Sequence, residues 1–93
     1  MEIMGVPMLE LKLFVQPNCP KCPAAKAVAE EVKKRRKDLD LRILDISDRE
    51  NYFTTLMLQI SSTPAFVVGE KTLFVGEVPS MEELNRKLDE CST

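Results

Sequence analysis

Apolar and polar positions alternate along the chain in segments that differ in period. Residues 9–15 alternate and then become fully apolar, which is typical of a buried strand, and residues 39–46 show a similar pattern. Two shorter apolar runs, 65–68 and 72–75, flank a Gly-containing turn at 69–71 and predict a hairpin. The pattern therefore predicts two longer strands and one hairpin.

Apolar residues also recur at the spacing of an α-helix. In the segment after the first strand they lie three and four positions apart, at Ala25, Val28, Ala29 and Val32. This helix is predicted to end in the basic run 33–37, because cations are favoured at the negative end of the helix dipole. That explanation of the basic run is favoured over an acidic partner.

Two further helices are predicted from caps and apolar faces. The first starts at Ser47 or Asp48, stops at the run 61–64, and carries an apolar face made of Phe53, Leu56, Met57 and Ile60. The second starts with a capping box of Ser80 and Glu83, and its apolar face holds Met81, Leu84, Leu88 and Cys91.

The elements follow one another as β-α-β-α-β-β-α, which defines an α/β fold. A strand–helix–strand unit places its two strands parallel, and the hairpin adds two strands, the last antiparallel to its neighbour. We expect a four-stranded mixed sheet with helices on both faces. Residues 9–93 are predicted to form one domain, preceded by a flexible lead-in over residues 1–8.

Composition narrows the function. The 93 residues include 13 basic and 15 acidic side chains, and the net charge of −2 gives no overall attraction to nucleic acid or to an anionic membrane. The absence of His excludes imidazole catalysis and His-ligated metal sites. No apolar run approaches the roughly 18–20 residues of a membrane span, and the N-terminus lacks the basic start of a secretory signal. We expect a cytoplasmic monomer.

The candidate chemistry lies in Asn18-Cys19-Pro20-Lys21-Cys22-Pro23, between the first strand and the first helix. In a reducing compartment, a C-x-x-C pair at such a junction favours redox chemistry. The first turn of a helix stabilises a thiolate, and residues three apart on it are close enough to form a disulfide. We interpret Cys19 as the nucleophile that attacks a substrate disulfide and Cys22 as the thiol that resolves the mixed disulfide.

The neighbours of the pair fit this interpretation. Pro20 is predicted near the first helical position, where its missing N–H is harmless. Lys21 is a cation that can favour the thiolate, with plain solvent exposure as its simpler role. Cys91 lies on the apolar face of the last helix, where packing is the favoured role.

Two other classes of protein compete with this interpretation. Structural zinc takes four ligands, and an iron–sulfur cluster takes four Cys, whereas this chain has three Cys and no His. A cluster would therefore have to be shared between two chains. A partner-binding domain whose dithiol only senses redox state is the third hypothesis.

Three features of the sequence together form a specific pattern. They are Cys19-Pro20-Lys21-Cys22 after a strand, Thr63-Pro64 about forty residues later, and Gly76 before a capped helix. This pattern resembles the thioredoxin superfamily, in particular small glutaredoxin-like and compact archaeal-type members, over residues 9–88. The resemblance implies a strand order of 2-1-3-4, a cis Pro64 facing the dithiol, and disulfide oxidoreductase activity. It also implies that the substrate is contacted by the backbone of Thr63 and by Pro64 and Gly76. The redox-active Cys19–Cys22 disulfide is then the only redox group that the reaction needs.

The chain departs from glutathione-dependent glutaredoxins at three places. Gln16 stands where they have Lys or Arg, Lys21 stands where they have Tyr or Phe, and residues 76–80 lack their Gly-Gly and acidic pair. Leu13 stands where thioredoxins have a buried Asp. The departures from glutaredoxin favour protein disulfides as substrates and a thioredoxin-reductase-like flavoprotein as electron donor. A glutathione-coupled glutaredoxin is the alternative within the class, and a thiolate metal or iron–sulfur module is the alternative outside it.

Overall fold

The computed structural model describes residues 9–91 of the chain. The predicted lead-in, residues 1–8, lies outside the described residues. The elements follow the predicted order and are β1 (Leu9–Val15), α1 (Cys22–Arg35), β2 (Leu39–Asp45), α2 (Arg49–Met57), β3 (Ala65–Val68), β4 (Lys71–Val75) and α3 (Met81–Cys91). None of the helices within these residues is long and apolar enough to cross a membrane.

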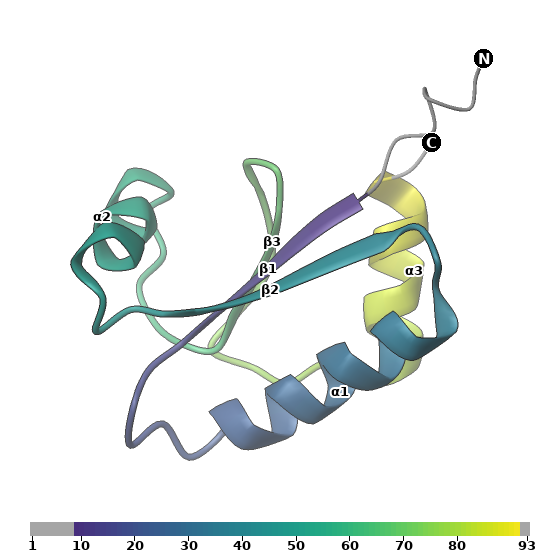
Figure 1. Ribbon diagram of the computed structural model, residues 1–93, viewed down its shortest axis with the longest axis horizontal. Helices are drawn as coiled ribbons and strands as arrows, with labels where there is room; N and C mark the ends of the chain where they lie inside the picture. The colour runs from purple at the N-terminus through teal and green to yellow at the C-terminus, as the bar shows by residue number, and fades with distance from the viewer. Residues whose placement is uncertain (1–8, 92–93) are drawn as a thin grey trace.

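The four strands form one sheet in the order β2-β1-β3-β4, which confirms the expected order (Figure 1). β1 runs parallel to β2 and antiparallel to β3, and β3 and β4 form the antiparallel hairpin. β1 therefore has a strand hydrogen-bonded to each of its edges. Its position explains why this strand becomes fully apolar towards its end, because both of its faces are covered there.

Helices lie on both sides of the sheet, α1 and α3 on one side and α2 on the other (Figure 1). The side chains of Leu11, Leu13 and Val15 belong to the core under α1 and α3. Phe14 points to the opposite face and packs with Ala65 and Val67 of β3. The alternation of β1 thus serves two separate cores, because successive side chains of a strand point to opposite faces.

The first helix starts later than predicted. Pro20 was expected near the first helical position, which is wrong, because α1 begins at Cys22 with Lys21 as its N-cap. The Cys22 N–H donates to the Cys19 carbonyl at 3.3 Å, and the bond that opens the helical ladder runs from Ala25 N–H to the Lys21 carbonyl at 3.0 Å. The reason is that Pro23 has no N–H to donate to the Cys19 carbonyl, so residues 19–21 close a turn before the helix begins.

The second helix is also shorter than predicted. Asp48 is its N-cap, and the Asp48 carboxylate accepts a hydrogen bond from the Glu50 N–H at 3.0 Å. The helix ends at Met57, so Ile60 lies beyond it. Gln59 has a φ of 59°, a left-handed conformation that stops the helix and turns the chain.

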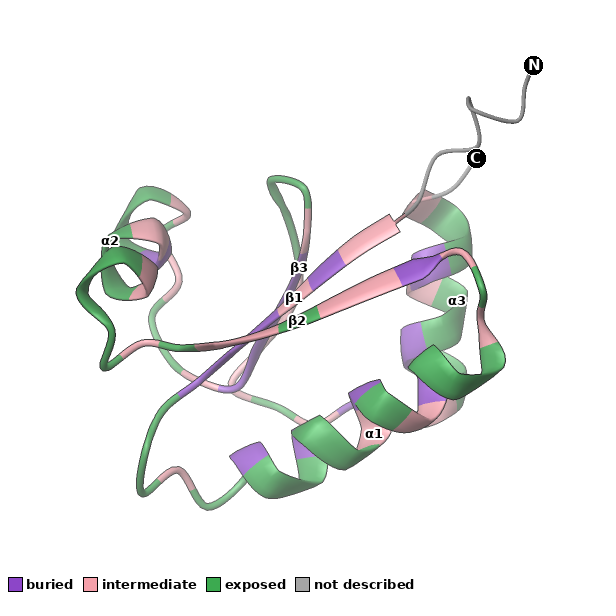
Figure 2. Ribbon diagram, viewed as in Figure 1, coloured by how far each residue is buried: buried purple, intermediate pink, exposed green. Residues whose placement is uncertain are grey.

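The predicted packing of this helix is wrong. Phe53, Leu56 and Met57 were expected to face the sheet, yet their side chains are 60%, 54% and 69% exposed. The buried residue of α2 is Thr55. The ribbon of this helix is otherwise green and pink in Figure 2, the colours of exposed and intermediate residues. The Phe14 cluster is covered instead by residues that flank the helix, namely Ile46, Leu58 and Ile60.

The C-terminal elements agree closely with the sequence pattern. Ser80 and Glu83 form the predicted capping box, with the Ser80 N–H donating to the Glu83 carboxylate at 2.9 Å and the Glu83 N–H donating to Ser80 Oγ at 3.1 Å. Leu84 and Leu88 of α3 are buried, and Cys91 is half-buried with a free thiol. The hairpin turn is one residue shorter than predicted, since β4 already begins with the residue after Glu70.

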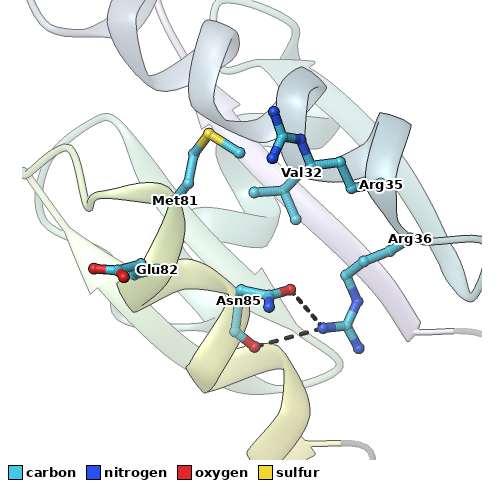
Figure 3. Close-up of a pocket in the computed structure, with 6 residues that line it drawn as sticks. All are labelled: Val32, Arg35, Arg36, Met81, Glu82 and Asn85. Atoms are coloured by element: carbon cyan, nitrogen blue, oxygen red, sulfur yellow. Dashed lines mark hydrogen bonds between the residues drawn. The ribbon is translucent and has the colours of Figure 1, made fainter.

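Arg36 joins the end of α1 to α3. Its side chain is only 13% exposed, and its guanidinium donates to Asp38 at 3.0 Å and to Asp89 at 2.8 Å. The guanidinium also donates to the Asn85 side chain at 2.7 Å (Figure 3). The hydrogen bond and the charge of Arg36 hold the pKa of Asp38 below its ordinary value. These bonds fix how α1 and α3 cross.

We expect Arg36→Gln to lower the free energy of unfolding by about 1–2 kcal/mol, because it removes charge-assisted hydrogen bonds from a mostly buried side chain. Arg35→Gln is the matched control. Its side chain is 68% exposed and pairs with Glu31 on the helix surface, so its loss is expected to cost about 0.5 kcal/mol or less. Urea unfolding measures both, and equal effects would contradict the role of Arg36.

We expect the fold to lose stability in acid because the ion pair between Arg36 and Asp38 is lost. Because the pKa of Asp38 is lowered in the folded state, its stabilising contribution is present above the unfolded pKa near 3.8 and disappears as the pH falls through the folded pKa. Asp38→Asn is expected to be less stable than the wild type at pH 7 and to lose less on acidification. Urea midpoints at pH 7, 4 and 3 measure this, and parallel pH curves would contradict it.

Candidate active site

Cys19 and Cys22 form a disulfide at the junction of β1 and α1, and their Cα atoms are 5.4 Å apart. The two cysteines differ in exposure. Cys22 opens the helix and is only 3% exposed, whereas Cys19 lies in the preceding turn and is half-buried. Of the two cysteines, the one in the turn is therefore the more exposed.

The turn that carries Cys19 depends on Asn18. Asn18 has a φ of 63°, the left-handed region that Asn tolerates better than most residues. The residues from Gln16 to Asn18 are exposed, so this turn brings the chain from the buried end of β1 to the surface. The sequence signals this turn, because an Asn directly after Pro17 is a common turn signal.

The loop before β3 lies next to the loop after β4. The Thr63–Pro64 peptide bond is cis, as the resemblance implied, and Pro64 is buried. The Gly76 N–H donates to the Pro64 carbonyl at 2.7 Å, and the Gly76 carbonyl accepts from Lys21 Nζ at 3.1 Å. Lys21 thus links the dithiol turn to the Gly76 loop, and Gly76 in turn bonds to the Pro64 loop. The structure therefore connects Lys21, Gly76 and Pro64 of the predicted site.

Thr63 is half-buried beside Pro64. Among the described residues its hydroxyl Oγ1 has no hydrogen-bond partner although the atom is buried. Pro20, in contrast, is exposed in the turn between the two cysteines.

Two charged residues that were not predicted share a cavity with the dithiol. The cavity has a volume of about 350 Å³, and its lining includes Cys19, Cys22, Lys26 and Asp45. The Ser47 N–H and hydroxyl donate to the Asp45 carboxylate, both at 2.8 Å, and these bonds hold its pKa below the ordinary value, with a smaller contribution from Lys26. An anionic carboxylate is therefore held beside the cavity.

The sequence contains signals from which Lys26 and Asp45 could have been predicted to lie near the dithiol. Lys26 lies four positions after Cys22 on the same helix, so it faces the same side. Asp45 ends β2 opposite Val15 of the parallel strand β1, so it lies at the sheet edge from which the dithiol turn departs.

This arrangement defines a class of protein. A pair of thiols three residues apart, closed to a disulfide at a strand-to-helix junction and linked to a cis-proline loop, can exchange two electrons with another disulfide. The fold and the site together are those of a thiol–disulfide oxidoreductase.

Comparison with known proteins identifies the family. The sequence profile described as Thioredoxin domain matches residues 9–89. A probable thioredoxin of Archaeoglobus fulgidus is 35% identical over 79 residues, covering 85% of this chain and 85% of that protein. A thioredoxin of Methanocaldococcus jannaschii is 34% identical over 76 residues, covering 82% of this chain and 87% of that protein. The chain belongs to the thioredoxin family.

Solved structures support the fold. An uncharacterized thioredoxin-like protein from Clostridium perfringens superposes with a TM-score of 0.75 at 15% identity, covering 89% of this chain and 70% of that chain. Malarial thioredoxin-2 superposes with a TM-score of 0.74 at 15% identity, covering 89% and 82%. Membership of the family implies, in general terms, disulfide-containing protein substrates and a reductase partner.

We expect Gly76→Ala to slow disulfide reduction several-fold. Gly76 has a φ of 74°, and a Cβ there would lie 2.7 Å from Ser62 Oγ, so the loop that binds Lys21 and Pro64 must shift. Gly69→Ala is the control, since its φ is 61° but its Cβ would meet open space. Both variants are expected to lose about 1–2 kcal/mol of stability from the left-handed backbone.

Adding Ser62→Ala to Gly76→Ala separates the effect of the close contact with Ser62 from the effect of the left-handed backbone. It relieves the contact of the new Cβ and is expected to restore much of the rate of Gly76→Ala, while the loss of thermal stability persists. If Gly69→Ala slowed the reaction as much as Gly76→Ala, the Gly76 loop would have no special role.

Proposed function

We propose that the protein reduces disulfide bonds of other proteins, with Cys19 as the attacking thiol and Cys22 as the resolving thiol. The observation that carries this assignment is the difference in exposure within one disulfide, with Cys22 only 3% exposed and Cys19 half-buried. An intermolecular mixed disulfide needs an accessible sulfur. The resolving attack of the second thiol on that mixed disulfide is intramolecular, so it needs only proximity.

The reaction balances without an additional redox group. The Cys19 thiolate attacks one sulfur of the substrate disulfide, and the other substrate sulfur leaves as a thiolate and takes up a proton. The Cys22 thiol then gives up its proton and attacks the Cys19 sulfur, which releases the second substrate thiol. Two electrons have moved to the substrate, and the Cys19–Cys22 disulfide is the product on the enzyme. The dithiol itself is the cofactor.

A flavoprotein reductase of the thioredoxin-reductase type is the proposed electron donor, and the proposed setting is the cytoplasm, with the protein acting as a monomer. The contacts of Lys21 support a protein partner over glutathione. Its ammonium is engaged by the Gly76 carbonyl and stands where glutathione-dependent relatives have an aromatic residue. Gln16, where those proteins have a cation, gives no charge for a glutathione carboxylate.

We expect Cys19→Ser to abolish insulin reduction with dithiothreitol as electron donor. Cys22→Ser is expected to form mixed disulfides with insulin chains that persist after the free reductant is removed and are visible by mass. Cys91→Ser is the matched control, because its half-buried thiol lies at the end of α3, and its rate is expected to equal that of the wild type.

Three results would contradict the proposal. Turnover by Cys19→Ser would overturn the roles of the two cysteines. Bound iron or zinc in the purified protein, detected by absorbance and metal analysis together with a lack of turnover, would favour the thiolate metal module. A reduction rate that depends on glutathione and glutathione reductase, and is absent with a flavoprotein thioredoxin reductase, would favour the glutaredoxin alternative.

A further inference from the structure

The side of α2 that faces away from the sheet is apolar. The large apolar side chains that are exposed within residues 9–91 all lie on this helix, and they are Tyr52, Phe53, Leu56 and Met57, between 50% and 69% exposed. Their spacing places them on one side of the helix, and they are called the α2 stripe below. An apolar stripe of this kind on a protein surface marks an interaction site.

The structure holds this stripe outward. Asp48 caps α2, and Asn51 Nδ2 donates to the Asp45 carbonyl at 3.0 Å, which ties the helix to the end of β2. Thr55 is the buried residue, 3% exposed, and its hydroxyl donates to the Tyr52 carbonyl at 2.6 Å. The polar side of α2 thus faces the protein, and its fixed orientation leaves the apolar side for another molecule.

The α2 stripe continues into the reactive edge of the protein. A groove of about 360 Å³ separates α2 from the segment before Pro64, and its lining includes Tyr52, Leu56, Ile60 and Thr63. The same groove reaches Gln16, three residues before Cys19 in the dithiol turn. A molecule that lies on the α2 stripe and fills this groove therefore ends beside the segments that flank the dithiol.

We propose that the α2 stripe docks the polypeptide arm that adjoins the disulfide of a protein substrate, and that this arm carries apolar side chains. The inference rests on the proposed reduction of protein disulfides. The nine residues of α2 span about 13 Å. An extended arm of six residues reaches about 20 Å, so it can follow the groove and lie over the whole stripe.

Other occupants fit the surface less well. A small disulfide that fills the groove leaves Phe53 and Met57 uncovered. A second copy of this chain docked through the stripe would cover the groove beside Thr63 in both copies, and the substrate could not approach along it. The polypeptide arm is the occupant that uses both the stripe and its connection to the dithiol.

The test compares two synthetic peptides, each with an internal disulfide and a six-residue arm. One arm carries Leu and Phe, and the other carries Ser and Gln at the same positions. Three prereduced proteins are compared: the wild type, the double variant Phe53→Gln with Met57→Gln, and the control Ala27→Gln, which changes an exposed position of α1. Each protein is mixed separately with each peptide and with hydroxyethyl disulfide. Alkylation and mass spectrometry give the second-order rate constants.

We expect the wild type and the Ala27→Gln control to react with the apolar peptide about tenfold faster than with the polar one, because docking buries apolar side chains of both partners. The double variant is expected to lose this preference to within about twofold. All three proteins are expected to react with hydroxyethyl disulfide at equal rates, which shows that the dithiol is unchanged.

Several results would overturn the inference. Equal rates of the wild type with the two peptides, or a preference that the double variant retains, would show that the stripe does not recognise the arm. A markedly lower melting temperature of the double variant would show that these side chains are buried in solution. A wild-type dimer in sedimentation that the double variant does not form would assign the stripe to a second copy.

Failure of the proposed function has a separate signature. If the wild type reduced neither peptide nor hydroxyethyl disulfide, the oxidoreductase proposal would fail together with the docking inference. If it reduced hydroxyethyl disulfide and both peptides equally, only the docking inference would fail.

Discussion

The structure depends on the burial of one strand, β1, between two others and between two cores. It hydrogen-bonds to β2 on one edge and to β3 on the other, and its side chains alternate between the core under α1 and α3 and the core around Phe14. Because β1 is held at both edges and on both faces, its end has a fixed position, and so does the start of the turn that follows it. That turn carries Cys19, which is how core packing determines where the reactive sulfur lies.

The helix α1 is fixed at both ends by side chains that reach over to other parts of the fold. At its start, Lys21 donates to the Gly76 carbonyl, and the Gly76 N–H donates to the Pro64 carbonyl. At its end, Arg36 connects to Asp38 and to α3. The first connection sets the dithiol turn against the two loops expected to contact the substrate, and the second keeps the crossing of α1 and α3 constant. A chemical step that needs two sulfurs and a substrate in line benefits from this rigid support.

The two faces of the sheet are covered in different ways. One face lies under two helices, whereas the other is covered by Ile46, Leu58 and Ile60, which flank α2 rather than belong to it. The left-handed Gln59 and the tie between Asn51 and β2 set the rotation of α2, so that its polar side faces inward. The apolar side is left on the surface, on the side of the helix that continues into the groove beside Thr63.

The sequence by itself determined the element order, the mixed sheet, the dithiol and the capping box of α3, because these follow from local periodicity, turn residues and spacing. The resemblance to a known family added the strand order and the cis peptide bond. The tertiary structure alone decided the contact of Lys21 with Gly76 and the outward face of α2. Such features join residues that are distant in sequence or depend on how a helix is rotated against its neighbours. Periodicity shows that a helix has an apolar side, but only the surrounding packing determines whether that side is covered by its own chain.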